Sequence, residues 1–258
     1  MLIAIKIGSN VLTRRDGTLD FTRMSALVDQ IAELRRAGMK VILISSGAVA
    51  SGRSEMNMPA AEVDEMGSVE QRQVFSAVGQ AKLIGRYVEL FRDHHIHVGQ
   101  VLTTKDNFLA HEPLQNQQQC MAAMLAHDVL PIVNENDTVC ITELMFTDND
   151  ELSGLIARLM GCNKLIILSN IDGIYTGDPS DPKSELIRTI HPADDLSQYI
   201  RAEKSAFGRG GMHSKYTTAC RVQAAGIPVI IANGKREDIL VRLMQQPEAT
   251  PHTEFITT

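Results

Sequence analysis

The sequence predicts an α/β fold: a three-layer α/β/α sandwich with a mostly parallel central sheet. Short, continuously apolar runs alternate along the chain with segments whose apolar residues recur at helical spacing. Because these runs are apolar at almost every position, they are typical of strands that helices cover on both faces. With 258 residues and 44% apolar content, the chain is long enough to bury a sizeable core. We therefore expect a single domain that spans residues 1–258.

The first part of the chain has a β-α-β pattern. Residues 2–8, LIAIKIG, form a short apolar run that ends at a glycine, and residues 40–45, KVILIS, form a second run. Between them, apolar residues recur at helical spacing: Met24, Leu27, Val28, Ile31 and Leu34. Gly38 follows this segment, and a glycine is a common helix terminator.

The alternation continues to the end of the sequence. We expect helices over about 69–92, 121–127, 149–161, 213–225 and 236–245, and strands over 97–102, 129–137, 163–170 and 227–233. Residues 140–146, CITELMF, suggest an added strand or hairpin, and residues 176–184, with two prolines, suggest a loop. No repeat, low-complexity run or long linker interrupts this order.

Charge, cysteine content and the N-terminus restrict the partners and the compartment. A net charge of -6 argues against a surface for polyanions, so we expect no nucleic-acid partner. The four cysteines are widely spaced and do not show the spacing of metal ligands, such as a CxxC pair, which suggests reduced thiols in a cytoplasmic protein. Residues 1–12 are too short an apolar stretch to span a bilayer and lack the pattern of a secretion signal, so we expect no membrane association.

Polar segments follow several predicted strands, where parallel sheets usually bind ligands. Lys6 ends the first strand next to Gly8, where backbone amides can approach an anion closely. Ser46 and Gly47 follow the second strand, in a turn suited to opening a helix that favours a carboxylate or phosphate. Alternatively, Lys6 extends to solvent, and Ser46 belongs to an ordinary helix cap.

Two Asx-rich segments concentrate further polar groups. They contribute Asn134, Asn136, Asp137, Asp148, Asn149 and Asp150. These residue types also form turns and helix caps, so a structural role for either segment is an open alternative. Acidic residues suit the first turn of a helix, and capping is compatible with an active-site role for Asp150.

Residues 207–215, FGRGGMHSK, match neither the Walker loop nor the dinucleotide fingerprint. Phosphoryl transfer needs cations around the transferred group and little covalent help from the protein. Lys6 and Lys215 supply two such cations, and Asp148 and Asp150 are placed to orient them or to recruit Mg²⁺ through water. A surface loop is the structural alternative. His94, His95 and His97 lack paired carboxylates or cysteines, which favours a solvated junction over a metal site.

With these segments in view, nearly the whole chain resembles the amino acid kinase family. The resemblance is carried by KIGSNVLT, VILISSGAVASGR, FSAVGQAKLI, HVGQVLTT, PIVNENDTV, FTDNDELS, DGIYTGDP and GGMHSK. Within the family it is closest to members that phosphorylate the γ-carboxylate of L-glutamate in the first step of proline biosynthesis. It implies the amino acid kinase fold, ATP as phosphoryl donor, and Mg²⁺ carried with ATP rather than in a fixed site.

The resemblance also implies roles for individual residues. Lys6, Lys215 and Asp150 correspond to the catalytic positions, with Asp150 organising the two lysines. The glutamate-binding positions correspond to Ser46, Gly47, Asn134, Asp137 and Asn149, of which Asp137 and Asn149 are expected to bind the amine. The ATP-binding positions correspond to Lys6, Gly8, Ser169, Asn170, Arg209, Gly210, Gly211, Met212, His213, Ser214 and Lys215.

This chain departs from the usual pattern of the family at three places. Ser169 and Asn170 replace Thr-Asp, Asn116-Gln117-Gln118 replaces Asn-Ala-Arg, and Thr147 replaces a glycine. These changes bear on nucleotide and substrate choice. They leave two alternatives open, a kinase for another acid such as aspartate or N-acetylglutamate or for a small phosphate, and a non-catalytic sensor of nucleotide or amino acid.

The family adds expectations about regulation and assembly. Many bacterial members carry a C-terminal PUA domain, and we expect none within residues 1–258. Proline as a feedback inhibitor, a homodimer or homotetramer, and association with glutamyl phosphate reductase are further expectations.

Overall fold

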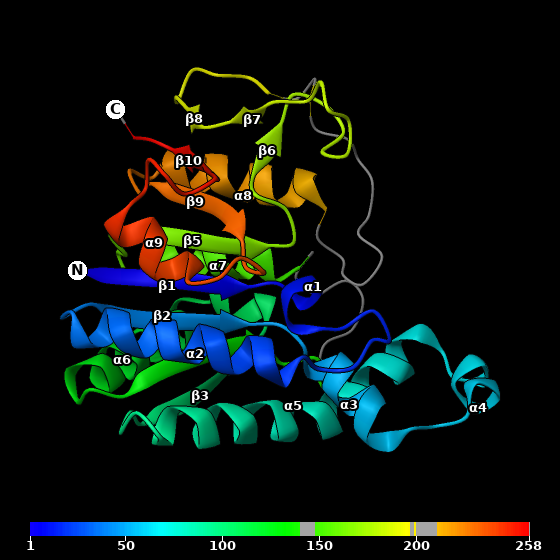
Figure 1. Ribbon diagram of the computed structural model, residues 1–258. Helices are drawn as coiled ribbons and strands as arrows, with labels where there is room; N and C mark the ends of the chain where they lie inside the picture. Colours follow the sequence, from blue (N-terminus) through cyan, green and yellow to red (C-terminus); the bar gives the residue numbers. More distant parts are fainter. Residues whose placement is uncertain (140–147, 197–198, 200–210, 258) are drawn as a thin grey trace.

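The central sheet of the protein joins segments from the whole chain. In the computed structural model, residues 1–139, 148–196, 199 and 211–257 are described. The strands of the main sheet are β1 (Leu2–Ile7), β2 (Lys40–Ser45), β3 (Val98–Thr103), β4 (Leu130–Glu135), β5 (Lys164–Ser169), β8 (Thr189–Ile190), β9 (Val229–Asn233) and β10 (His252–Phe255). Among the described residues their order is β3-β4-β2-β1-β5-β9-β10-β8. Pairing is parallel from β3 to β9, which confirms the mostly parallel sheet (Figure 1).

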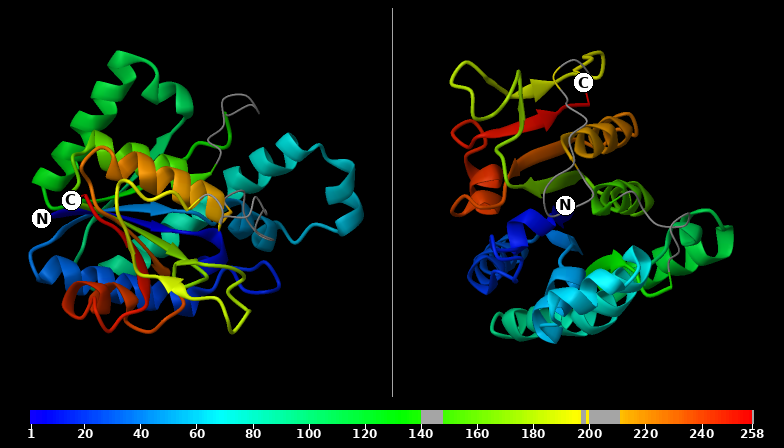
Figure 2. Two further views of the ribbon diagram at one scale, coloured as in Figure 1. Left: turned by 90° about the horizontal axis from the view of Figure 1, so that it is seen from above. Right: turned by 90° about the vertical axis from the view of Figure 1, so that its right-hand side faces the viewer.

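Helices cover both faces of this sheet, as the two views in Figure 2 show. The helices are α1 (Ser9–Leu12), α2 (Phe21–Arg36), α3 (Ala48–Met56), α4 (Ala60–Glu65), α5 (Ser68–Arg92), α6 (His111–Ala126), α7 (Asn149–Leu159), α8 (Met212–Gln223) and α9 (Ile239–Gln245), with a 3₁₀ turn at Lys105–Phe108. One core layer packs α2, α5 and α9 against the sheet, and the other packs α6, α7 and α8. The predicted three-layer α/β/α sandwich is therefore confirmed.

The apolar strands read in the sequence are buried on both faces. Along β1, Ile3 and Ile5 belong to the core layer with α2, whereas Ala4 belongs to the layer with α7 and α8. Because side chains alternate along a strand, Lys6 lies on the same face as Ala4. This parity directs Lys6 toward α7 and α8.

The loop predicted at 176–184 is confirmed, and several other elements differ from the sequence predictions. The helix α6 begins at His111, ten residues before the predicted start at 121. The strand β10 pairs antiparallel with β9, and its four residues HTEF are too short and too polar to stand out as a buried strand. The predicted loop at 176–184 is enclosed by a small hairpin of β6 (Ile174–Tyr175) and β7 (Leu186–Ile187). The helix α9 begins at Ile239, three residues later than expected, because Asp238 has a left-handed φ of 49°. The segment 140–146 lies outside the described residues.

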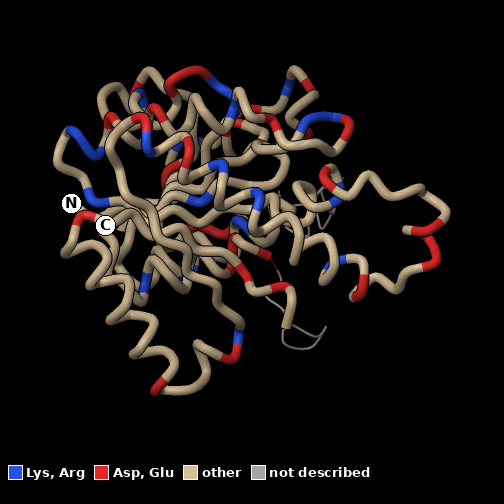
Figure 3. The backbone as a smooth tube through the Cα atoms, turned by 90° about the horizontal axis from the view of Figure 1, so that it is seen from below, with Lys and Arg blue, Asp and Glu red and all other residues tan. Residues whose placement is uncertain are grey.

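An arm formed by α3, α4 and the start of α5 projects from the sandwich (Figure 2). Basic and acidic residues are interspersed along the described backbone, and the arm carries several acidic ones (Figure 3). Across the described part of the chain, no helix has the length and apolarity needed to cross a membrane. Cys120, Cys162 and Cys220 are free thiols, whereas Cys140 lies outside the described residues.

The helices α3 and α5 cross with their backbones in contact. A Cβ on Gly79 of α5 would lie 1.8 Å from the Ala48 carbonyl oxygen, and one on Gly52 would lie 1.8 Å from the Phe75 carbonyl oxygen. Real Cβ atoms do not approach backbone oxygens so closely, so only glycine allows this crossing. The contact fixes α5 relative to the turn at Ser46 and Gly47 that precedes α3.

We predict that Gly79→Ala lowers the free energy of unfolding by roughly 3 kcal/mol or more, because the two backbones must separate. Gly85→Ala in the same helix is the matched control, since a Cβ there meets no atom within 4 Å. The control should raise the free energy of unfolding by up to about 1 kcal/mol through helix propensity. Urea unfolding of the three proteins measures both changes, and equal effects of the two substitutions would contradict the tight crossing.

Candidate active site

Two lysines from distant parts of the chain share one buried carboxylate. Lys6 Nζ lies 2.6 Å from Asp150 Oδ1, and Lys215 Nζ lies 3.0 Å from Asp150 Oδ2. Lys6 comes from β1, Asp150 from the first turn of α7, and Lys215 from the first turn of α8. Asp150 is 0% exposed, and the two lysines are 5% and 7% exposed. The predicted convergence of Lys6 and Lys215 around Asp150 is thus present in the fold.

The triad of Lys6, Asp150 and Lys215 carries one net positive charge. Burial would raise the pKa of Asp150, but the two lysine charges outweigh it and hold that pKa below its ordinary value. Burial also lowers the pKa of Lys6, and attraction to Asp150 opposes this change only in part. A second anion near the lysines would relieve the cost of burying two ammonium groups around one carboxylate. The triad is therefore suited to receive a phosphoryl group.

Asp148 is the N-cap of α7 and does not contact either lysine directly among the described interactions. Its Oδ1 accepts hydrogen bonds from the backbone N–H groups of Asp150 at 2.8 Å and Glu151 at 3.1 Å. Its Oδ2 is buried and accepts no hydrogen bond from the described residues. Burial is the largest cause that raises the pKa of Asp148, and repulsion from Asp150 adds to it. A hydrogen bond from the Ser214 side chain opposes this rise in part. Such a carboxylate oxygen fits an incoming cation.

Beside the triad, amide and hydroxyl groups form a connected chain. Asn149 Nδ2 donates to Ser46 Oγ and to Asn134 Oδ1, both at 2.9 Å. Asn134 Nδ2 in turn donates to Gln80 Oε1 at 2.8 Å. Gly47, next to Ser46, has a φ of 109°, a left-handed conformation that favours glycine. The predicted residues Ser46, Asn134 and Asn149 therefore lie together.

Asp137 lies in a neighbouring cluster of charged groups. Arg72 Nε donates to Asp137 Oδ1 at 2.5 Å, and Ser76 Oγ donates to Asp137 Oδ2 at 3.1 Å. The same guanidinium donates from Nη2 to Glu135 Oε2 at 2.6 Å. Glu135 and Asp137 are 4% and 6% exposed. Sequence reasoning missed Arg72, Ser76 and Gln80, although their four-residue spacing places them on one face of α5.

The residues expected to bind nucleotide lie at the ends of β1 and β5 and at the start of α8. Gly8 donates its backbone N–H to the Leu168 carbonyl oxygen, and a Cβ on Gly8 would lie 3.4 Å from Lys6 Nζ. Ser169 ends β5 and is buried, whereas Asn170 is exposed. Gly211 caps α8, and Met212, His213 and Ser214 form its first turn before Lys215. Arg209 and Gly210 lie outside the described residues, as does Thr147.

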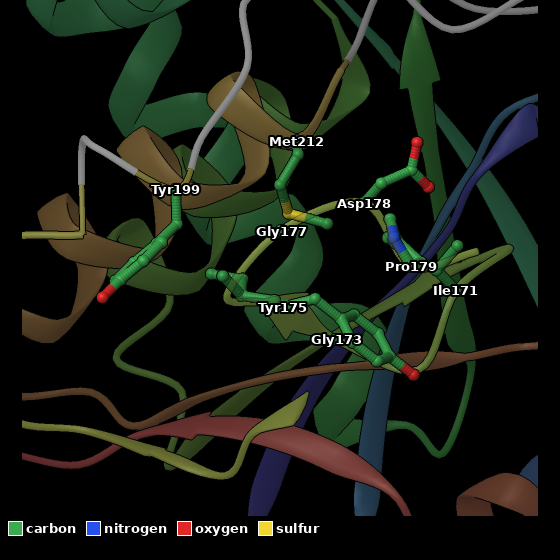
Figure 4. A pocket seen from close by; sticks show the side chains of 9 residues that line it. Ile171, Gly173, Tyr175, Gly177, Asp178, Pro179, Tyr199 and Met212 are labelled. Atoms are coloured by element: carbon green, nitrogen blue, oxygen red, sulfur yellow. The ribbon is translucent and has the colours of Figure 1, made fainter. Parts of the chain in front are cut away.

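A pocket of about 200 Å³ opens next to this first turn of α8. Its lining is drawn in Figure 4 and consists of Ile171, Gly173, Ile174, Tyr175, Gly177, Asp178, Pro179, Tyr199 and Met212. In the close-up, the Tyr175 ring lies across the pocket from the thioether of Met212. An aromatic face opposite a flexible sulfur-containing side chain is suited to a flat heterocycle.

One ion pair holds the loop that forms this pocket. Arg236 donates to both Asp172 oxygens, at 2.6 and 2.7 Å, and Asp172 lies within the loop between β5 and β6. Hydrogen bonds from Arg236 are the leading reason that the pKa of Asp172 is lowered. The pair thereby joins the loop after β5 to the turn after β9.

The other residues singled out in the sequence lie elsewhere. Gln118 donates to the Leu159 carbonyl oxygen at 2.8 Å, at the opposite end of α7 from Asp150. Gln117 accepts a hydrogen bond from Thr103 at 2.9 Å, at the end of β3. His94 contacts Asp29 at 2.8 Å on the surface. Among the described residues, no group of three or more His, Cys, Asp or Glu is placed to hold a metal.

Comparison with known proteins shows the family of this chain. The model of the amino acid kinase family matches residues 1–233. The chain is 66% identical to the glutamate 5-kinase of Bacteroides thetaiotaomicron, over 98% of this chain and 69% of that protein. It is 45% identical to the glutamate 5-kinase of Chlorobaculum tepidum, over 98% of this chain and 68% of that protein.

Solved structures share the fold at low sequence identity. The carbamate kinase of Giardia lamblia bound to AMP-PNP has a TM-score of 0.70 and 16% identity, covering 100% of this chain and 98% of that one. An isopentenyl phosphate kinase has a TM-score of 0.66 and 13% identity, covering 99% of this chain and 100% of the other. These likenesses concern the fold.

We predict that Asp148→Asn raises the stability of the ligand-free protein at neutral pH. The folded-state pKa of Asp148 lies above its unfolded value, so its contribution favours folding at low pH and is lost as the pH rises through the folded-state pKa. Asparagine keeps the oxygen that caps α7 and removes the charge. Thermal unfolding at several pH values should show the greatest gain in Tm above that pKa.

Asp20→Asn is the matched control, because Asp20 is also an N-cap and accepts from the backbone N–H of Arg23 at 3.1 Å. This control should not show the same gain. An equal change in both variants would trace the effect to helix capping in general.

Proposed function

This chain belongs to the amino acid kinase family, and from that premise we propose that it transfers the γ-phosphoryl group of ATP to the γ-carboxylate of L-glutamate, the first step of proline biosynthesis. The observation that carries the proposal is the buried triad of Lys6, Asp150 and Lys215 beside the polar chain of Ser46, Asn149 and Asn134. It sets a phosphate-attracting charge next to groups that can bind a small amino acid. The glutamate 5-kinases it matches support the choice of substrate.

In the proposed reaction, a γ-carboxylate oxygen of glutamate attacks the γ-phosphorus of ATP in line with the leaving oxygen. A bond forms between that carboxylate oxygen and phosphorus, the bond to the β-phosphate oxygen breaks, and ADP leaves. A carboxylate is ionised at neutral pH, so the reaction needs no general base. The protein's part is to hold two anions together and to stabilise the charge of the transferred group.

We assign the two lysines to the two ends of the transferred group. Lys6, beside Gly8, stabilises the phosphoryl group in transfer, and Lys215 contacts the phosphates from the nucleotide side. Asp150 holds both ammonium groups in place, at 2.6 and 3.0 Å. It touches the reacting groups only through these lysines.

ATP binds, in this proposal, along the edge formed by β5 and the start of α8. The base occupies the pocket between Tyr175 and Met212, and the phosphates run toward Gly8 and Lys215. The remaining nucleotide contacts are assigned to Ser169, Asn170, Gly211, His213 and Ser214, together with Arg209 and Gly210. The Asp172–Arg236 pair holds the loop that contributes to this pocket.

Mg²⁺ accompanies ATP in the same proposal. The unpartnered Oδ2 of Asp148 and the raised pKa of that carboxyl fit a cation at this place, either directly or through water. When bound, Mg²⁺ would neutralise part of the charge of the phosphates. Asp148 would hold it beside α7, with Asp150 committed to the lysines.

Glutamate is assigned to the polar chain and the charged cluster. Ser46, Gly47, Asn134 and Asn149 bind its polar groups, and Asp137 binds its ammonium group. A kinase for another acid in the same fold and a non-catalytic sensor are the alternatives to this assignment. We further propose the cytoplasm as compartment, a homodimer or homotetramer, proline as an inhibitor, and association with glutamyl phosphate reductase.

The function is tested by ADP release with Mg-ATP and a panel of acids, with hydroxylamine present to trap an acyl phosphate. The panel contains glutamate, aspartate, N-acetylglutamate, and bicarbonate with ammonia. Glutamate-dependent ADP release accompanied by a hydroxamate is the expected outcome. ADP release with another acid and not with glutamate would show that this other acid is the substrate. No ADP release with any acid of the panel, while ligands still bind, would favour the non-catalytic sensor.

We predict that Lys6→Ala lowers kcat by at least about a hundredfold, the usual cost of removing one electrostatic stabiliser of a transition state. Glutamate binding should be largely retained, because the substrate-side groups are contributed by other residues. Lys40→Ala, an exposed residue at the start of β2, is the control and should keep normal turnover. Steady-state kinetics and calorimetric binding of glutamate measure the two effects, and unchanged turnover would remove Lys6 from its assigned role.

We also predict that Tyr175→Leu raises the KM for ATP roughly tenfold, because stacking of a base on an aromatic ring contributes about 1–3 kcal/mol. Tyr175→Phe keeps the ring and should restore the KM. The KM for glutamate should stay the same in both variants, since the pocket lies on the nucleotide side. A KM for ATP that does not respond to Tyr175→Leu would place the base elsewhere.

A further inference from the structure

One face of α5 contacts the polar segment after β4 at several consecutive positions. Gln80 accepts from Asn134 at 2.8 Å, Ser76 donates to Asp137 at 3.1 Å, and Arg72 contacts both Glu135 and Asp137. These three helix residues are four positions apart, so they share one face. Gln73 adds a hydrogen bond to the Thr138 carbonyl oxygen at 3.3 Å. This face of α5 therefore makes hydrogen bonds along the segment from residue 134 to residue 138.

The two oxygens of Asp137 have different partners on this face. Arg72 Nε donates to Oδ1, and the Ser76 hydroxyl donates to Oδ2. Arg72 also contacts Oδ1 through its Nη2, so the guanidinium engages this oxygen with two nitrogens. A carboxylate held from two sides by one helix has a fixed plane, and Oδ2, which accepts the Ser76 hydroxyl, has a second lone pair for another donor. The side chains of α5 therefore set the orientation of the Asp137 carboxylate.

The charges of the cluster favour a cation as the next partner. Glu135 and Asp137 contribute two formal negative charges and Arg72 one positive charge, so the three groups carry one net negative charge. Glu135 and Asp137 are 4% and 6% exposed, and charge interactions are stronger in such a setting than in water. An ammonium group beside Asp137 would balance this charge. A neutral or acylated nitrogen would not.

Resting on the proposed function, we propose that Arg72 and Ser76 are positioning residues that make the substrate site selective for a free α-ammonium group. They act through Asp137, whose carboxylate they orient, and Glu135 supplies the second negative charge of the cluster. The contact between Gly52 and Gly79 holds this face of α5 in register with Ser46, which lies just before α3. In this proposal, the residues that select for the amine are different from the triad of Lys6, Asp150 and Lys215, which binds the phosphoryl group.

The test compares glutamate with glutarate, which has both carboxylates and lacks the amine. Calorimetric binding in the presence of AMP-PNP and Mg²⁺ gives a Kd for each ligand. Wild-type protein should bind glutamate more tightly than glutarate. In Arg72→Met this preference should fall by at least about tenfold, because a site built around a polar substrate group discriminates through that group. The Kd of glutarate and the KM for ATP should change by less than about threefold.

Ser76→Ala is the second variant, since it removes one oxygen and no charge, and it keeps the test valid should Arg72→Met fold poorly. Its preference for glutamate should fall by about three- to tenfold, in line with one lost hydrogen bond. Arg86→Met is the matched control, because Arg86 lies on the same helix in a surface pair with Glu89 at 2.7 Å. This control should keep the wild-type preference.

The outcomes separate the inference from the proposed function. Equal losses for glutamate and glutarate in both variants, or an unchanged ratio of the two Kd values, would overturn the role given to Arg72 and Ser76. Failure of the wild-type protein to phosphorylate glutamate would instead overturn the proposed function. Turnover of glutamate by wild type with an unaltered preference in the variants leaves the function standing and removes this inference alone.

Discussion

The arrangement of the site depends on one buried carboxylate that neutralises part of the charge on two buried lysines. Without Asp150, Lys6 and Lys215 would repel each other at the centre of the fold, and burial would lower the pKa of Lys6 without an opposing attraction. With it, three strand and helix ends are joined at one point. Burying two ammonium groups around one carboxylate leaves one positive charge without a counter-charge in the triad. A further anion, such as the phosphate proposed to bind here, would offset the free-energy cost of burying that charge.

Sheet register brings this interaction about. Lys6 is paired with Ile44 in β2 and with Ile167 in β5, which places it at the centre of the parallel sheet. The strand alternation directs it to the face covered by α7 and α8, and both helices present their first turns there. Helix N-termini carry partial positive charge, which supports the carboxylate cap at Asp148 and the proposed binding of phosphates near the start of α8.

Much of the layered fold could be predicted from the sequence, because buried parallel strands and amphipathic helices have distinct periodicities. Lys6 could be singled out because a lysine at the end of an apolar strand needs a partner. Asp150 and Lys215 were singled out by their polar and glycine-rich segments, and the resemblance to the family joined the three. The antiparallel strand β10 could not be predicted from the sequence, because its four residues, HTEF, are few and do not form a continuous apolar run. Arg72, Ser76 and Gln80 were missed for another reason. Their spacing marks a polar helix face, but only the tertiary fold identifies the segment that it contacts.

The crossing of α3 and α5 through Gly52 and Gly79 has an evolutionary consequence. It makes the substrate-side scaffold a rigid module whose outward side chains can change while its backbone stays in place. The phosphoryl-side residues belong to β1, α7 and α8 and take no part in that crossing. A lineage could therefore acquire a new acceptor acid by exchanging a few side chains along α5, with its phosphate chemistry inherited unchanged.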